Sequence, residues 1–250
     1  MNSSLLMSFL ILIVIILISG GILYFTSIKN KFEIKNNPAV NELKKSIGLS
    51  IEDGRGIHIS IGKSDIQNIH GAASLVGLET LNQILDQSVL SDNPPITTAG
   101  SGDIALLAQS KLQKIESENA NVQQETGSSA YLAGATNYGY IAGVIPHTVD
   151  PNLSSQVFVG NIGPEIGLLL DTNIKQNHFS LAATDNLEGQ SVSYAFSNEA
   201  LIGEEIFSVP AQLNPKNETK KISLILHDLL RWLVIGIILI AILLKLIGLL

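Results

Sequence analysis

The sequence predicts an α/β fold, in which a mostly parallel sheet carries helices on both of its faces. Between residues 56 and 202, five or six short apolar segments with strand character alternate with segments of helical periodicity. Each strand and its helix take about 25 to 40 residues, which suits the crossover connections that parallel neighbours require. Two long apolar segments frame this region at the ends of the 250-residue chain.

The first strand and the first helix follow from the spacing of apolar residues. Residues 56–62 place isoleucine at every second position between two glycines, which predicts a strand. Apolar residues then recur near helical spacing over residues 65–89, and Ser64 is expected to cap that helix. His58 and Ser60 alternate with the isoleucines, so they share one strand face, where a hydrogen-bonded polar pair is favoured over a catalytic one.

The remaining segments repeat this alternation. Pro146 is expected to end one helix because its nitrogen carries no hydrogen, and Pro164 suits the first turn of another. The order predicts a Rossmann-like domain, for which about 170 residues provide a sufficient core. The expected strands are residues 95–99, 130–133, 156–160, 179–183 and 199–202, and the expected helices are residues 104–115, 137–146, 164–170 and 186–196, with a polar loop at 116–127.

Both ends of the chain are predicted to form transmembrane helices. Residues 5–25 contain no charged side chain, and residues 232–250 contain only Lys245. Helices of this length cross a hydrocarbon core of about 30 Å. A cleaved signal peptide is the less favoured alternative for the first segment, because no basic residue precedes it and no Ala-x-Ala site follows. The expected anchors at the membrane interface are Lys29, Lys31, Arg231 and Trp232.

Charge divides the chain into five parts. Residues 46–215 hold five basic and 18 acidic residues, a formal charge of −13, whereas the net charge of the whole chain is −7. The basic residues between the two spans predict a cytoplasmic central domain at the cell membrane, with both termini outside. The parts are an N-terminal anchor (1–27), a basic linker (28–45), the acidic α/β domain (46–215), a second basic linker with the start of the last helix (216–231) and the C-terminal span (232–250).

Composition and motifs argue against several function classes. A chain without cysteine has no disulfide, zinc-thiolate site, iron-sulfur cluster or cysteine nucleophile, and its acidic balance disfavours nucleic acid as a partner. Residues 62–64 (GKS) lack the earlier glycine of a phosphate-binding loop, because position 57 is Ile. Residues 100–103 (GSGD) lack the third glycine of a dinucleotide fingerprint, so a capped turn is favoured over nucleotide binding. No histidine pair has the spacing of a helical zinc site and no Gly-x-Ser-x-Gly elbow occurs, so the sequence indicates no metal, cofactor or hydrolase.

Polar residues recur where the predicted strands end. Ligands of open parallel sheets bind outside the carboxyl ends of the strands, and an acid occurs at each of these ends. Helix capping and the helix dipole also favour acids there, and this explanation is preferred. The alternative is a polar cleft for a cation or a small hydroxylated or amine ligand. Its candidate residues are Ser64, Asp65, Ser101, Asp103, Asn161, Glu165, Thr184, Asp185, Glu204 and Glu205.

Several segments resemble a known family. Residues 201–207 (LIGEEIF), 160–165 (GNIGPE), 140–144 (YIAGV) and 228–232 (DLLRW) are similar to those of an uncharacterised prokaryotic family of membrane-anchored proteins with a domain of unknown function. The similarity runs from about residue 37 to the end, although the strand at 57–61 lacks a proline that the family has there. The resemblance implies a Rossmann-like domain and a membrane topology, but no activity and no catalytic residue.

Two function classes remain. The first is a non-enzymatic membrane-anchored scaffold or assembly component, whose partners are the lipid bilayer and either further copies or another membrane protein. Gly20, Gly21 and Gly236 would permit close packing of such spans. The second is a small-ligand-binding sensor or an unrecognised enzyme that uses the acidic cleft. The scaffold is favoured because few candidate catalytic groups are present.

Overall fold

Six parallel strands form one sheet in the computed structural model, in the order β3-β2-β1-β4-β5-β6. Connections run outward in both directions from β1 and β4, as in dinucleotide-binding α/β domains, which confirms the predicted Rossmann-like class. The structure describes residues 36–88, 93–118 and 129–215, with 231, 234, 235, 237 and 238. The strands are β1 (Gly56–Ile61), β2 (Ile96–Ala99), β3 (Ser129–Leu132), β4 (Leu153–Gly160), β5 (Phe179–Thr184) and β6 (Glu199–Leu201).

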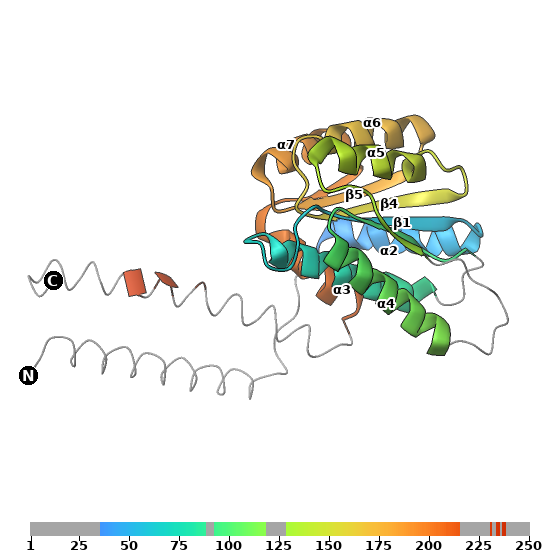
Figure 1. Ribbon diagram of the computed structural model, residues 1–250, viewed down its shortest axis with the longest axis horizontal. Helices are drawn as coiled ribbons and strands as arrows, with labels where there is room; N and C mark the ends of the chain where they lie inside the picture. Colours follow the sequence, from blue (N-terminus) through green and yellow to red (C-terminus); the bar gives the residue numbers. More distant parts are fainter. Residues whose placement is uncertain are drawn as a thin grey trace, which may run out of the picture. The chain divides into compact units, whose positions relative to one another are not determined.

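Helices cover both faces of the sheet (Figure 1). Isoleucines of β1 pack into a core beneath the first group of helices, whereas Phe158 of β4 and Ala182 of β5 face the second group. The alternation that predicts β1 therefore points its isoleucines into one core. The first group is α2 (Pro38–Glu52), α3 (Gly71–Ser88), α4 (Gly102–Glu118) and α8 (Val209–Leu213), preceded by the 3-10 helix η1 (Gly203–Ser208); the second is α5 (Asn137–Thr148), α6 (Ile166–Gln176) and α7 (Leu187–Phe196).

Helix α2 includes residues 38–45, which the sequence analysis assigns to the basic linker. The side chain of Asn37 caps it by accepting a hydrogen bond from the backbone nitrogen of Ala39 at 3.0 Å. Val40, Leu43 and Ile47 are buried at helical spacing. The lysines of this segment indicate a linker, but its buried apolar side chains make it part of the compact unit.

Three predicted helix boundaries are wrong. Helix α3 begins at Gly71, so residues 62–70 form a loop and Ser64 is not a helix cap. Helix α5 continues past Pro146 to Thr148, because a proline in the last turn removes only its own hydrogen bond. Helix α6 begins after Pro164 and continues to Gln176, where Asn177 ends it in the left-handed conformation with φ 56°.

The two ends of the compact unit Asn36–Asn214 are hydrogen-bonded to each other. The backbone nitrogen of Asn37 donates to Oε1 of Gln212, 2.8 Å away. Among the described residues, no helix is both long enough and apolar enough to cross a membrane. The predicted span at 5–25 lies outside the described residues, as does most of the span at 232–250.

Close backbone contact at the ends of β1 and β4 requires glycine at position 62. The backbone nitrogen of Gly62 donates to Val159 at 3.0 Å, and a Cβ at position 62 would overlap the backbone of Asn161. We expect Gly62→Ala to lower the free energy of unfolding by about 1 to 3 kcal/mol through overpacking. Urea denaturation of the full chain, followed by pulse proteolysis, measures this loss. Gly102→Ala is the matched control, because a Cβ there meets nothing within 4 Å; an equal loss in both variants would contradict the explanation.

Candidate functional site

The loop of residues 62–70, called the β1–α3 loop below, lies at the carboxyl ends of the strands and contacts three of its neighbours. Its Lys63 backbone nitrogen donates to the carbonyl oxygen of Asn161 after β4, at 2.9 Å. Its His70 contacts Asp185 after β5, and its Ile66 contacts Asp103 at the start of α4. The loop therefore joins the segments that follow β2, β4 and β5, where Rossmann-like domains bind ligands.

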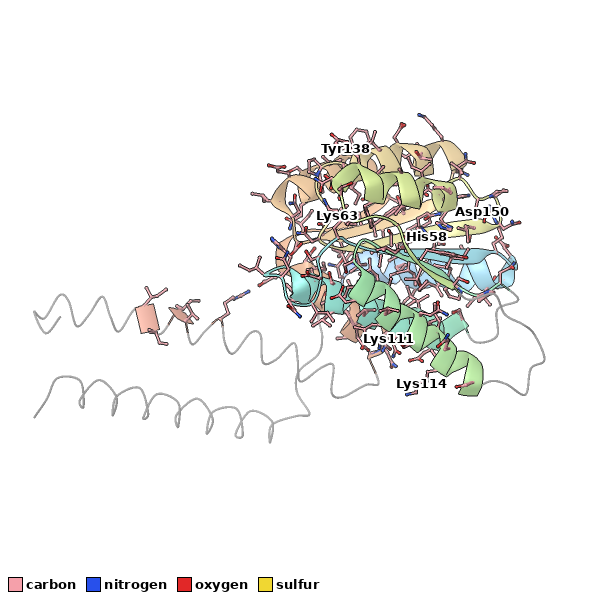
Figure 2. The ribbon with its side chains drawn as sticks, viewed as in Figure 1. His58, Lys63, Lys111, Lys114, Tyr138 and Asp150 are labelled. Atoms are coloured by element: carbon pink, nitrogen blue, oxygen red, sulfur yellow. The ribbon has the colours of Figure 1, made fainter. Side chains whose placement is uncertain are left out.

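Lys63 and Glu165 form a partly buried ion pair at this edge. The Lys63 ammonium donates to Oε1 of Glu165 and, at 2.7 Å, to Oδ1 of Asn137. The two charged side chains are only 14% and 6% exposed. Burial acts to raise the pKa of Glu165, but the hydrogen bond and the charge of Lys63 lower it below its usual value. In Figure 2, Lys63 lies at one end of the sheet and Asp150 toward the other, with His58 between them.

His70, Asp185 and Asn161 form a second polar group. Nδ1 of His70 lies 2.7 Å from Oδ2 of Asp185, and the Asn161 amide donates to Oδ1 of the same carboxylate at 2.8 Å. Both oxygens of Asp185 are therefore engaged. The His70 side chain is 44% exposed and the Asp185 side chain 19% exposed. A carboxylate that orients an imidazole in this way leaves the second ring nitrogen available for a ligand or a proton.

Asp103, Ser64 and Ser101 fix the start of the β1–α3 loop rather than line a cleft. Asp103 accepts hydrogen bonds at 2.9 Å from the backbone nitrogens of Ile66 and Ile104. Burial acts to raise the pKa of Asp103, but these bonds, with one from Ser101, lower it. The Ser64 carbonyl oxygen accepts from Ser74 at 2.6 Å. The capped turn predicted at residues 100–103 thus fits these contacts.

The other predicted site residues do not join these groups. Thr184 is buried, and its hydroxyl donates to the carbonyl oxygen of Ile162 at 2.8 Å. Asp65 and Glu204 are exposed, and Glu205 accepts from the backbone of Ile202 at 3.3 Å, beyond β6. Of the predicted membrane anchors, Arg231 is exposed, whereas Lys29, Lys31 and Trp232 lie outside the described residues.

A chain of buried hydrogen bonds crosses the sheet beneath α5. The Gln156 amide nitrogen donates to the backbone of His147 at 3.2 Å, so its oxygen faces Nδ1 of His58, 2.5 Å away. Nδ1 must then carry the proton, and Nε2 accepts from the Thr98 hydroxyl at 2.9 Å. Burial is the main cause that lowers the pKa of His58 to about 3, so its ring is neutral.

The same chain continues from β1 to α5. With its proton donated to His58, the Thr98 oxygen accepts from Ser60 at 2.8 Å, and Ser60 in turn accepts from the Tyr140 hydroxyl at 2.6 Å. Burial and the charge of Glu165 raise the pKa of Tyr140, while its bond to Ser60 acts to lower it. Each of these hydroxyl groups donates to one acceptor. His58 and Ser60 are thus both hydrogen-bonded, as predicted, but each bonds to Thr98 and not to the other. The amide of Gln156 cannot relay a proton, so the chain positions α5 rather than conducts protons.

The site combines one oriented imidazole, His70, and one ammonium group, Lys63, with two partly covered carboxylates, Asp185 and Glu165. Across the described residues, no three His, Asp or Glu side chains are grouped so as to hold a metal ion. His70 can accept a proton or a hydrogen bond, whereas Lys63 is held by its two acceptors. This arrangement can exchange hydrogen bonds with a small polar group.

Sequence reasoning missed His70, Lys63 and Asn137 as members of the site. His70 was considered only for zinc spacing, and Lys63 only for a phosphate-binding loop. Their partners are Asp185, 115 positions away, and Glu165, 102 positions away. No local pattern carries pairings of that separation, although the predicted parallel sheet does place the segments that follow its strands at one edge.

Comparison with known proteins gives a family but no relative of known activity. A family model described as a domain of unknown function (DUF6754) matches residues 2–250. This agrees with the resemblance to an uncharacterised family. No curated protein and no solved structure matches the chain.

Proposed function

The chain belongs to the DUF6754 family, a family of unknown function, and we propose that it is a non-enzymatic membrane scaffold that displays its α/β domain at the cytoplasmic face of the cell membrane. One observation carries this proposal. The ends of the domain, Asn37 and Gln212, are hydrogen-bonded at 2.8 Å, so both connections to the apolar terminal segments leave the domain at one place. Such a domain suits a tether by two neighbouring spans, with further copies or another membrane protein as its partner.

Single-cysteine labelling tests this topology, because the natural chain contains no cysteine. We expect a membrane-impermeant maleimide to label Ser3→Cys in intact cells, since that residue precedes the first span. Gln113→Cys, on the exposed surface of α4, should be labelled only after lysis. Labelling of Gln113→Cys in intact cells would show the opposite orientation, and recovery of the chain in the carbonate-soluble fraction would contradict membrane anchoring.

Native mass spectrometry of the detergent-extracted chain tests the scaffold role. We expect a discrete oligomer or complex, and a bare monomer would contradict the scaffold.

A second candidate function is the binding of a small polar ligand at the carboxyl ends of the strands. His70 favours it, because Asp185 orients the imidazole at a half-exposed position in the region where open α/β sheets bind ligands. Helix capping by acidic residues would not require an oriented imidazole at this position. A ligand site and a scaffold are compatible, because a tethered domain can report on what it binds.

A further inference from the structure

Large apolar side chains are exposed at the edge of the sheet where the strands end. Each belongs to a segment that follows a strand: the β1–α3 loop follows β1, α4 follows β2, α5 follows β3 and α7 follows β5. A single exposed apolar side chain needs no explanation, but several on one face mark an interaction surface. Four of these side chains are between 72% and 90% exposed, namely Ile69, Leu106, Tyr138 and Leu187.

Contacts of the β1–α3 loop bring these side chains onto one surface. Ile69 directly precedes His70, and Leu187 follows Asp185 by two positions. Nδ1 of His70 lies 2.7 Å from Oδ2 of Asp185, so the two apolar side chains flank one contact. The same loop also contacts the starts of α4 and α5. The exposed apolar residues of those two helices therefore lie around this loop as well.

The chain enters the domain toward the same edge. Figure 1 shows α2 alongside β1, and a turn of residues 53–55 joins the end of α2 to the start of β1. The hydroxyl oxygens of Ser50, in the last turn of α2, and Ser154, at the start of β4, are 2.6 Å apart. The first turn of α2 therefore lies toward the carboxyl ends of the strands. Residues 26–35 alone separate the predicted first span from the described domain. Ten residues reach at most about 35 Å, less than the diameter of about 40 Å expected for the domain, so this edge is held close to the bilayer.

We propose that this edge of the α/β domain docks onto the bilayer surface, with Ile69 and Leu187 inserted between the lipid headgroups. Apolar side chains gain free energy when they leave water for the boundary between headgroups and acyl chains. The exposed acids of the same edge, Asp65, Glu188 and Glu204, would be repelled by anionic lipid, so the partner is a zwitterionic bilayer surface. This inference rests on the membrane scaffold proposed above and adds the orientation of its domain.

Fluorescence quenching of the full chain in phosphatidylcholine nanodiscs tests this surface. Because the natural chain has no cysteine, Ile69→Cys, Leu187→Cys and Leu49→Cys can each carry a single fluorophore. Leu49 is the matched control, because it is exposed in the last turn of α2, at the opposite edge. We expect lipids with a nitroxide on the acyl chain to quench the first two fluorophores, and aqueous iodide to quench only the third. Equal quenching at all three positions would overturn the proposal. Protection from iodide without quenching by the nitroxide lipid would show that a second copy or another protein covers the face, and would also overturn it.

A substitution at the surface measures the contribution of one apolar side chain. In the labelled Leu187→Cys chain, Ile69→Gln should shift the equilibrium at least about tenfold toward the undocked domain, the usual worth of burying an isoleucine side chain. Ile69 is almost fully exposed, so the substitution leaves the fold intact. Leu49→Gln should leave the equilibrium unchanged. An unchanged equilibrium in Ile69→Gln would refute the docking surface.

Failure of this inference is distinguishable from failure of the membrane scaffold. Carbonate extraction and the labelling of Ser3→Cys report anchoring and orientation, and neither depends on Ile69. A chain that stays in the membrane fraction, with the fluorophore at Leu187→Cys quenched only by iodide, would refute the docking surface and leave the anchor in place. A chain recovered in the carbonate-soluble fraction would contradict both.

Discussion

Acidification below pH 6.5 is expected to destabilise the α/β domain by about 1.4 kcal/mol for each pH unit through His58 alone. His58 is fully buried, and burial lowers its pKa from 6.5 to about 3, an effect that Gln156 partly opposes and His147 adds to. Between these values the unfolded chain binds a proton that the folded chain does not. The contribution of His58 is therefore complete above pH 6.5 and falls with pH until about pH 3, a total of about 5 kcal/mol.

Urea denaturation followed by pulse proteolysis of the full chain, at steps from pH 7.5 to pH 5, measures this slope. The carboxyl groups whose pKa is lowered by hydrogen bonds, Asp103 and Glu165, stay ionised over this range. His58→Gln removes the titrating ring and should be less stable at pH 7.5, but its stability should depend less steeply on pH. The same slope in the natural chain and in His58→Gln would show that this histidine does not set the acid sensitivity.

The alternation of strands and helices from β1 to β6 could be predicted from the sequence because apolar residues recur there at strand or helix spacing. The β1–α3 loop could not be predicted, because Ile66 and Ile69 are three positions apart, the spacing of apolar residues on one face of a helix. In the structure they are 40% and 90% exposed. The backbone of Ile66 donates to Asp103 instead of continuing a helix, so contacts with α4 decide its conformation.

The candidate site could be predicted only in its location. Acids at the ends of parallel strands indicate the correct edge, but the pattern does not separate Asp103, which binds backbone nitrogens, from Asp185, which orients His70. That distinction depends on which distant side chain reaches each carboxylate. The buried chain of hydrogen bonds could likewise be predicted only in part. The alternation in β1 places His58 and Ser60 on one face but does not reveal Thr98 between them.

Removing one member of the Lys63–Glu165 pair is expected to destabilise the domain strongly. Both side chains are largely buried, and Lys63→Met leaves the Glu165 carboxylate without its cation, a loss of about 3 to 5 kcal/mol in the free energy of unfolding. Glu165→Gln leaves the Lys63 ammonium with Asn137, so we expect a smaller loss. The double variant removes both charges and should be more stable than Lys63→Met alone.

A double-mutant cycle by pulse proteolysis in urea at pH 8 measures the coupling between these two side chains. We expect the two single losses to exceed the loss in the double variant by about 0.5 to 3 kcal/mol, the range for groups in direct contact. Lys175→Met with Asp171→Asn is the matched control, because that pair is exposed and should couple by less than about 0.5 kcal/mol. Additive losses at Lys63 and Glu165 would mean that the ion pair does not hold the β1–α3 loop to the start of α6. A large coupling would show that this ion pair holds the β1–α3 loop to the start of α6.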